Sequence, residues 1–164
     1  MKILFLGHRP QDLGGFEKNS LQEAISEQIY KIIKELTPHD VVLTSLGLGI
    51  ETWAAQHCNY FNDPQDFKDR PYHVYIPFKD PHSKWPFASR KLYTALLNGA
   101  SKKISLDDGP YDISKVIAKD VAMCQEADTI YTFFKDYPKF LNKFSSKIVN
   151  SMPKETSDEF FISL

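Results

Sequence analysis

The segment Val-Val-Leu-Thr-Ser-Leu-Gly-Leu-Gly-Ile-Glu-Thr-Trp-Ala-Ala, residues 41–55, decides the fold. Residues 41–45 are a short, mostly apolar run, which is typical of a strand buried on both faces. Residues 46–49 contain two glycines, and a helix is predicted from about residue 50 to residue 61. A strand, a glycine loop and a helix in this order make one unit of a parallel α/β sheet.

The same order recurs along the chain. Strands are predicted at residues 2–6, 41–45, 72–78, 103–106 and 129–134, with a sixth at 147–149. The connections are too long for hairpins, so the strands are expected to pair in parallel. We therefore expect an α/β fold: a Rossmann-like three-layer α/β/α domain with a mostly parallel sheet of five to six strands. This single domain is expected to fill residues 1–150, followed by a C-terminal tail at 151–164.

Helix starts are marked by capping residues. Residues 20–23, Ser-Leu-Gln-Glu, match a capping box, in which Ser20 and Glu23 satisfy each other's free backbone amides. A further helix is predicted at residues 90–98. Asp112 is expected to cap the helix before the fifth strand. The predicted buried stripe of this helix consists of Val116, Ile117, Val121, Cys124 and Ala127.

Composition excludes several classes of protein. The chain has 164 residues, of which 42% are hydrophobic and 25% are charged, and its net charge is −1. A near-neutral chain gives no sign of the basic face that duplex nucleic acid requires. The apolar runs are too short to span a bilayer, and no secretory signal is seen, so we expect a cytoplasmic protein without membrane contact. Two cysteines without paired spacing are expected to be reduced.

The loop after the second strand is the strongest candidate for ligand binding. Gly47 and Gly49 let the backbone approach a ligand, and the following helix presents its positive end to an anion. Ser45 and Thr52 add hydroxyl groups, while Glu51 suits ribose hydroxyls or proton transfer. The alternative interpretation is a tight turn in which an acidic residue stabilises the start of a helix.

The loop after the first strand supplies a cation to the same sheet edge. Gly7, His8 and Arg9 follow the strand directly, and a guanidinium suits phosphate or carboxylate. The alternative is a surface ion pair of Arg9 with Asp12 or Glu17.

Aromatic residues give a less specific signal. Trp85, in the long loop after the third strand, either stacks on a base or fastens that loop to the domain. Trp53 is interpreted as a core residue. The sequence has no phosphate-binding P-loop motif, no nucleophile elbow and no metal-ligand spacing, so no metal and no cofactor are predicted.

Taken together, the motifs resemble the YpsA-like branch of the SLOG (SMF/DprA–LOG) superfamily. The resemblance covers roughly residues 2–134 and rests on residues 7–10, 46–55 and 76–78, on Trp85, Tyr93 and Tyr111, and on 126–128. It implies a Rossmann-like sheet that binds nucleotides or nucleotide-derived metabolites. The implied pocket residues are Gly7, Arg9, Ser45, Gly47, Gly49, Glu51 and Thr52.

Two departures from the family pattern bear on activity. Many relatives have a second glycine-rich loop after the fifth strand, where this chain has residues 135–139, Lys-Asp-Tyr-Pro-Lys. The arginine–asparagine pair often found in the fourth helix is replaced by Lys119-Asp120. Both changes argue against transferring an enzymatic activity from the relatives.

The expected function is binding of a nucleoside monophosphate, ADP-ribose or NAD-like ligand, as a sensor or sequestering module of bacterial or phage origin. The alternative is an N-glycosidic hydrolase of nucleotides with Glu51 as its catalytic residue. Single-stranded DNA binding of the DprA type is a third interpretation, disfavoured by the net charge of −1. Relatives of this kind are often dimers, so a homodimer is an open expectation.

Overall fold

The computed structural model of the protein describes residues 1–7, 9–15, 17–62 and 69–133. Within them, five strands form one sheet in the order β4-β3-β2-β1-β5, and every neighbouring pair is parallel. The strands are β1 (Lys2–Gly7), β2 (Val41–Thr44), β3 (Tyr72–Ile76), β4 (Lys102–Ser105) and β5 (Thr129–Phe133). The predicted parallel sheet is confirmed. The proposed sixth strand and the C-terminal tail lie outside the described residues.

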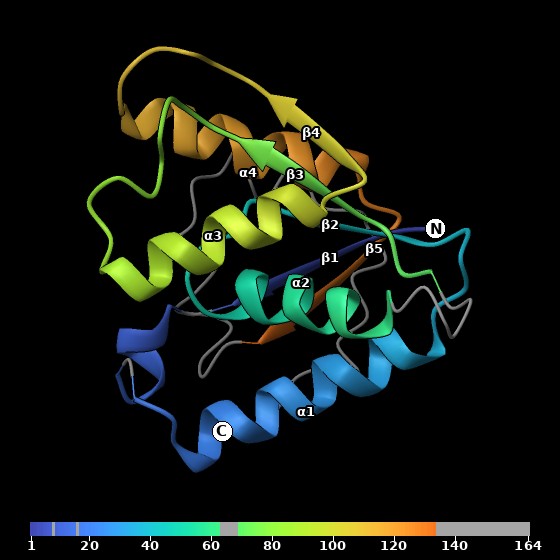
Figure 1. Ribbon diagram of the computed structural model, residues 1–164. Helices are drawn as coiled ribbons and strands as arrows, with labels where there is room; N and C mark the ends of the chain where they lie inside the picture. Colours follow the sequence, from blue (N-terminus) through green and yellow to red (C-terminus); the bar gives the residue numbers. More distant parts are fainter. Residues whose placement is uncertain (8, 16, 63–68, 134–164) are drawn as a thin grey trace.

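Helices cover both faces of the sheet, as Figure 1 shows. Helices α1 (Ser20–Glu35), α2 (Ile50–Phe61) and α3 (Phe87–Gly99) pack on one face, and α4 (Ile113–Glu126) packs on the other. A short 3-10 helix, η1 (Pro10–Leu13), lies between β1 and α1. The molecule is therefore the three-layer α/β/α domain that the sequence predicts.

The central strand β1 explains why the sheet needs both helical layers. Ile3 and Phe5 belong to the core under α1, α2 and α3, whereas Leu4 and Leu6 belong to the core under α4. All four side chains are at most 5% exposed. Such burial on both faces produces the continuous apolar run seen in the sequence.

The start of α1 differs from the predicted capping box. Asn19, not Ser20, is the N-cap residue, and its side-chain oxygen accepts the backbone N–H of Gln22 at 3.0 Å. The Asn19 amide also donates to the carbonyl of Leu13 at 2.8 Å and so ties η1 to the helix. Ser20 is the first helical residue. Asn19 and Ser20 could each cap the helix, and the hydrogen bond to the Leu13 carbonyl favours Asn19.

Other predicted boundaries shift by one to three residues. Helix α3 begins at Phe87 rather than at residue 90, because Pro86 serves as its N-cap residue and accepts the Arg90 backbone N–H at 3.0 Å. Strand β3 ends at Ile76 rather than at residue 78, because Pro77 has no N–H with which to continue the ladder. The predicted α2, Asp112 as the cap of α4, and the free thiols of both cysteines are confirmed.

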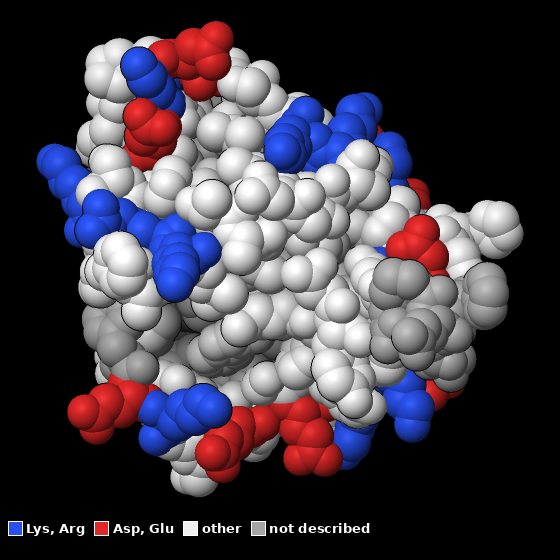
Figure 2. All heavy atoms as spheres, viewed as in Figure 1, with Lys and Arg blue, Asp and Glu red and all other residues white. Residues whose placement is uncertain are grey.

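The described part of the chain contains no helix long and apolar enough to cross a membrane. In Figure 2, charged side chains of both signs lie around the margin of the face formed by α1, α2 and α3, and the centre over α2 and α3 is uncharged. This face therefore shows no continuous basic band of the kind that tracks a nucleic-acid backbone.

Candidate ligand site at the carboxyl edge of the sheet

The loops after β1 and β2 meet at the carboxyl edge of the sheet, because these strands are parallel neighbours. Gly7 ends β1 at a crowded point. A Cβ atom built there would collide with the Ile50 side chain and lie 2.7 Å from the Phe133 carbonyl oxygen. A glycine is therefore required for the start of α2 and the end of β5 to approach β1 this closely.

The loop between β2 and α2 is held by hydrogen bonds within itself. The Thr52 hydroxyl donates to the carbonyls of Gly47 at 2.8 Å and Leu46 at 3.2 Å. Leu46 and Gly49 have positive φ angles of 58° and 97°. Thr52 is 6% exposed, so its hydroxyl shapes the loop from inside. Gly49 adopts a conformation that few other residues could take.

Glu51 folds back over this loop instead of pointing away from it. One carboxylate oxygen accepts the Ser45 backbone N–H at 2.9 Å, and the other accepts the Ser45 hydroxyl at 2.9 Å. A Cβ atom on Gly47 would lie 2.7 Å from the same carboxylate. The glycine at this position thus leaves room for the Glu51 carboxylate, which lies against the loop.

Lys119 completes this arrangement from the opposite side of the sheet. It lies on α4, is 8% exposed, and donates through its ammonium to the Ser45 hydroxyl oxygen at 3.2 Å. The same ammonium forms an ion pair of 2.7 Å with Asp120. Ser45 therefore links Glu51 on α2 to Lys119 on α4.

Electrostatics keep this lysine charged. Burial lowers the pKa of Lys119, but the carboxylates of Glu51 and Asp120 outweigh burial, and the pKa is raised above its ordinary value of 10.5. A nearby Arg9 acts in the opposite direction. Lys119 is thus an ammonium ion at neutral pH and cannot serve as a general base for Ser45.

Sequence reasoning missed Lys119 and Asp120 as site residues. The predicted stripe of α4 is confirmed at the buried Cys124 and Ala127, and Ile117 and Val121 pack partly buried against the same core. Val116 is half-buried, and the buried Lys119 and Met123 were not predicted. A signal was present, since Lys119 lies three residues after Val116 and four before Met123, which is helical spacing. A lysine on an inward-facing helical stripe indicates a buried charge that needs partners.

The other predicted residues have different surroundings. Arg9 is exposed and forms no ion pair with any described residue, so the predicted alternative pairing with Asp12 or Glu17 is not observed. His8 lies outside the described residues.

Trp85 is half-buried and meets Tyr93 of α3 edge-on, with ring centroids 5.6 Å apart. His82 stacks on Tyr93 at 4.1 Å, so these rings fasten the loop after β3 to the helix. Trp53 packs partly buried against the core, in agreement with its predicted role. The described residues contain no group of three His, Cys, Asp or Glu side chains that could hold a metal ion.

An open parallel sheet with glycine loops and charged side chains at its carboxyl edge defines the protein as a Rossmann-like α/β domain. Its sequence matches the YspA SLOG family over residues 3–163. It is also similar to the UPF0398 protein BH1768 of Halalkalibacterium halodurans, with 28% identity over 143 residues that cover 83% of this chain and 74% of that protein. The chain belongs to the YpsA family of SLOG proteins.

Proposed function

We propose that this protein binds a nucleotide or a nucleotide-derived metabolite at the carboxyl edge of its sheet. The observation that carries the proposal is the network that joins the buried Ser45 and Lys119 to the half-buried Glu51. Burying the Lys119 ammonium is unfavourable unless it is fully paired, and an apolar side chain would serve the fold at least as well. Such a network at the ligand edge of a Rossmann-like sheet therefore supports a binding role.

In this arrangement the loops after β1 and β2 bind different parts of the ligand. Because the Glu51 carboxylate lies in front of Gly47, a phosphate group placed there would be repelled. Arg9, which is exposed and without an ion-pair partner among the described residues, is the group that binds phosphate in this proposal. Glu51 then accepts hydrogen bonds from ribose hydroxyls.

The order of the strands supports the same position for the ligand. The chain passes from β1 through β2 and β3 to β4 on one side, and then crosses to β5 on the other side of β1. Ligands of open α/β sheets bind where the strand order reverses, here next to the end of β1. Gly7 lies at this point, beside Phe133 of β5.

Binding without turnover is favoured over hydrolysis. Both oxygens of Glu51 already accept hydrogen bonds from Ser45, so the carboxylate is held in place. A catalytic acid or base must exchange a proton with the substrate, whereas a carboxylate that recognises hydroxyl groups only accepts. The N-glycosidic hydrolase remains the alternative.

In the same proposal, Trp85 lies at the rim of the ligand site, where the exposed part of its ring is available to stack on a base.

The cellular location and the oligomeric state of the protein belong to the same proposal. The two buried, free cysteines support a reducing, cytoplasmic location. A homodimer, the single domain at 1–150 and a bacterial or phage origin remain parts of the same proposal.

The experiment is a thermal-shift panel of nucleoside monophosphates, ADP-ribose and NAD, followed by mass spectrometry of the recovered ligand. We expect at least one compound to raise the melting temperature of the wild type and to be recovered intact. Recovery of a free base, abolished in Glu51→Gln, would establish the hydrolase instead. A panel in which no compound shifts the wild type would contradict both.

A further inference from the structure

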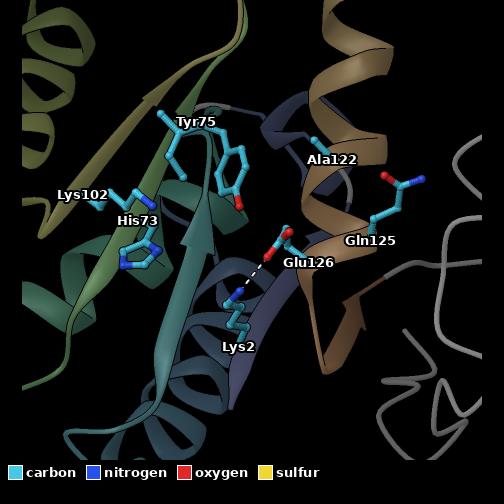
Figure 3. Close-up of a pocket in the computed structure, with 8 residues that line it drawn as sticks. Lys2, His73, Tyr75, Lys102, Ala122, Gln125 and Glu126 are labelled. Carbon is cyan, nitrogen blue, oxygen red and sulfur yellow. Dashed lines mark hydrogen bonds and ion pairs between the residues drawn. The ribbon is translucent and has the colours of Figure 1, made fainter.

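A cavity of about 320 Å³ lies at the edge of the sheet opposite the candidate site, on the face covered by α4 (Figure 3). It opens beside the first residues of β1 and β4 and the last turn of α4. The polar side chains that line it are Lys2, His73, Tyr75, Lys102, Gln125 and Glu126. None of them belongs to the site at the carboxyl edge.

The cavity exists because α4 does not cover the whole sheet. Helix α4 packs on β1 and β3, and the edge strand β4 extends beyond it. His73 of β3 is paired in register with Lys102 of β4, and both contribute to the cavity wall. Side chains alternate along a strand, so Lys103 lies on the other face of β4.

Two ring side chains present unpaired polar groups to this cavity. Tyr75 is 5% exposed, yet its hydroxyl makes no hydrogen bond with any described residue. Figure 3 shows the hydroxyl directed toward the space between β3 and α4. The imidazole of His73, half-buried, also has no hydrogen-bond partner in the described part of the chain. Neither group is sealed from solvent, so both are open to hydrogen bonding with a ligand that enters the cavity.

The charges around the cavity favour an anion. Lys2 pairs with Glu126, in the last turn of α4, at 2.5 Å. Lys102 is exposed and has no ion-pair partner among the described residues. Burial lowers the pKa of His73, and the ammonium groups of Lys102 and Lys2 lower it further. Of the two lysines that line the cavity, Lys102 is therefore the one without an ion-pair partner among the described residues, and it lies next to two neutral donors.

We propose that this cavity is a second ligand site, which binds a compact oxyanion, a phosphate or carboxylate group, through Lys102, Tyr75 and His73. The Tyr75 hydroxyl and one His73 N–H donate to the oxyanion, and the Lys102 ammonium supplies the charge. The volume of about 320 Å³ is at the lower end of the range for small-molecule sites, so the group belongs to a small metabolite or is a free ion.

The test is NMR observation of the His73 imidazole during titration with sulfate, inorganic phosphate and ribose 5-phosphate. Sulfate does not change its charge near neutral pH, so any change in its affinity with pH comes from titrating groups of the protein. We expect a saturable shift of the His73 signals. We also expect affinity for sulfate to increase about threefold or more from pH 8 to pH 6, because an imidazolium binds an anion better than an imidazole does.

Three variants decide the assignment. Lys102→Met should abolish saturable binding and Tyr75→Phe should weaken it, while Lys103→Met, which removes an equal charge from the other face of β4, should leave it unchanged. Tighter binding of ribose 5-phosphate than of phosphate would identify the group as part of a metabolite, and equal binding would identify a free ion. An unsaturable response, or one that is equal in Lys102→Met and the wild type, would overturn the proposal.

Discussion

The ammonium nitrogen of Lys119 lies 3.2 Å from the hydroxyl oxygen of Ser45, although 74 residues separate them in the sequence. The contact joins α4, on one face of the sheet, to the loop that begins α2 on the other face. Ser45 donates its own hydroxyl proton to Glu51 at 2.9 Å. A change at any of the three residues is therefore expected to affect both the stability of the domain and the shape of the ligand site.

Removing the buried ammonium should destabilise the domain in a pH-dependent way. Lys119→Met leaves the carboxylates of Glu51 and Asp120 without their cation, and we expect the free energy of unfolding at pH 7 to fall by about 2–4 kcal/mol. The folded-state pKa of Lys119 is raised. Its contribution is therefore fully present below the unfolded value of 10.5 and is lost as pH rises through the folded value.

Urea unfolding of wild type and Lys119→Met at pH 7, 9 and above 10.5 checks this. The difference between the two proteins should shrink only at the highest pH. Lys31→Met removes a lysine that pairs with Glu27 on the exposed side of α1, and it should change stability by about 0.5 kcal/mol or less. A difference for Lys119→Met that stayed constant across the series would refute an electrostatic role.

The cap of α1 offers a test between two adjacent residues. Asn19→Ala should lower the free energy of unfolding by about 1–2 kcal/mol, because it removes the bond to the Gln22 N–H and the bond to the Leu13 carbonyl. Ser20→Ala should change it by less than about 0.5 kcal/mol. Chemical denaturation of both variants measures the two losses. A larger loss in Ser20→Ala than in Asn19→Ala would instead support the capping box in which Ser20 is the cap.

Two glycine substitutions should separate folding from binding. Gly7→Ala places a Cβ atom against the Ile50 side chain and the Phe133 carbonyl, and the fixed backbone oxygen leads us to expect a loss of about 1–3 kcal/mol in stability. Gly47→Ala meets only the end of the flexible Glu51 side chain. We expect this variant to fold, to displace the carboxylate, and to weaken nucleotide binding about tenfold.

Calorimetric titration of both folded variants, alongside urea unfolding, makes this comparison. Wild-type affinity in Gly47→Ala would mean that the position of Glu51 does not matter for the ligand.

The parts of the fold that follow from local patterns were predictable. Strand β1 is buried on both faces, so its apolar run is visible in the sequence without any knowledge of its neighbours. The convergence of the loops after β1 and β2 follows from parallel pairing, which brings Arg9 and Ser45 to one edge. The first prediction depends on the local sequence alone, and the second depends only on the chain direction of adjacent strands.

The network itself was not predicted, because helical spacing allows more than one inward-facing stripe on α4. Whether Lys119 faces the sheet depends on how α4 is rotated, and a helical stripe drawn through Val116 and Val121 excluded it. The choice of Asn19 over Ser20 depends on a contact with Leu13, which a cap pattern does not contain. In each case a tertiary contact decides between local alternatives of similar free energy.

The most direct test of the proposed function is calorimetric titration of a nucleotide from the panel into wild type, Arg9→Ala and Lys34→Ala. Lys34 is an exposed cation in the last turn of α1, so its variant controls for the loss of one positive charge. We predict that Arg9→Ala weakens binding about tenfold or more, while Lys34→Ala binds as the wild type does. Equal affinity in all three proteins, or no measurable binding to the wild type, would contradict a nucleotide site at the carboxyl edge.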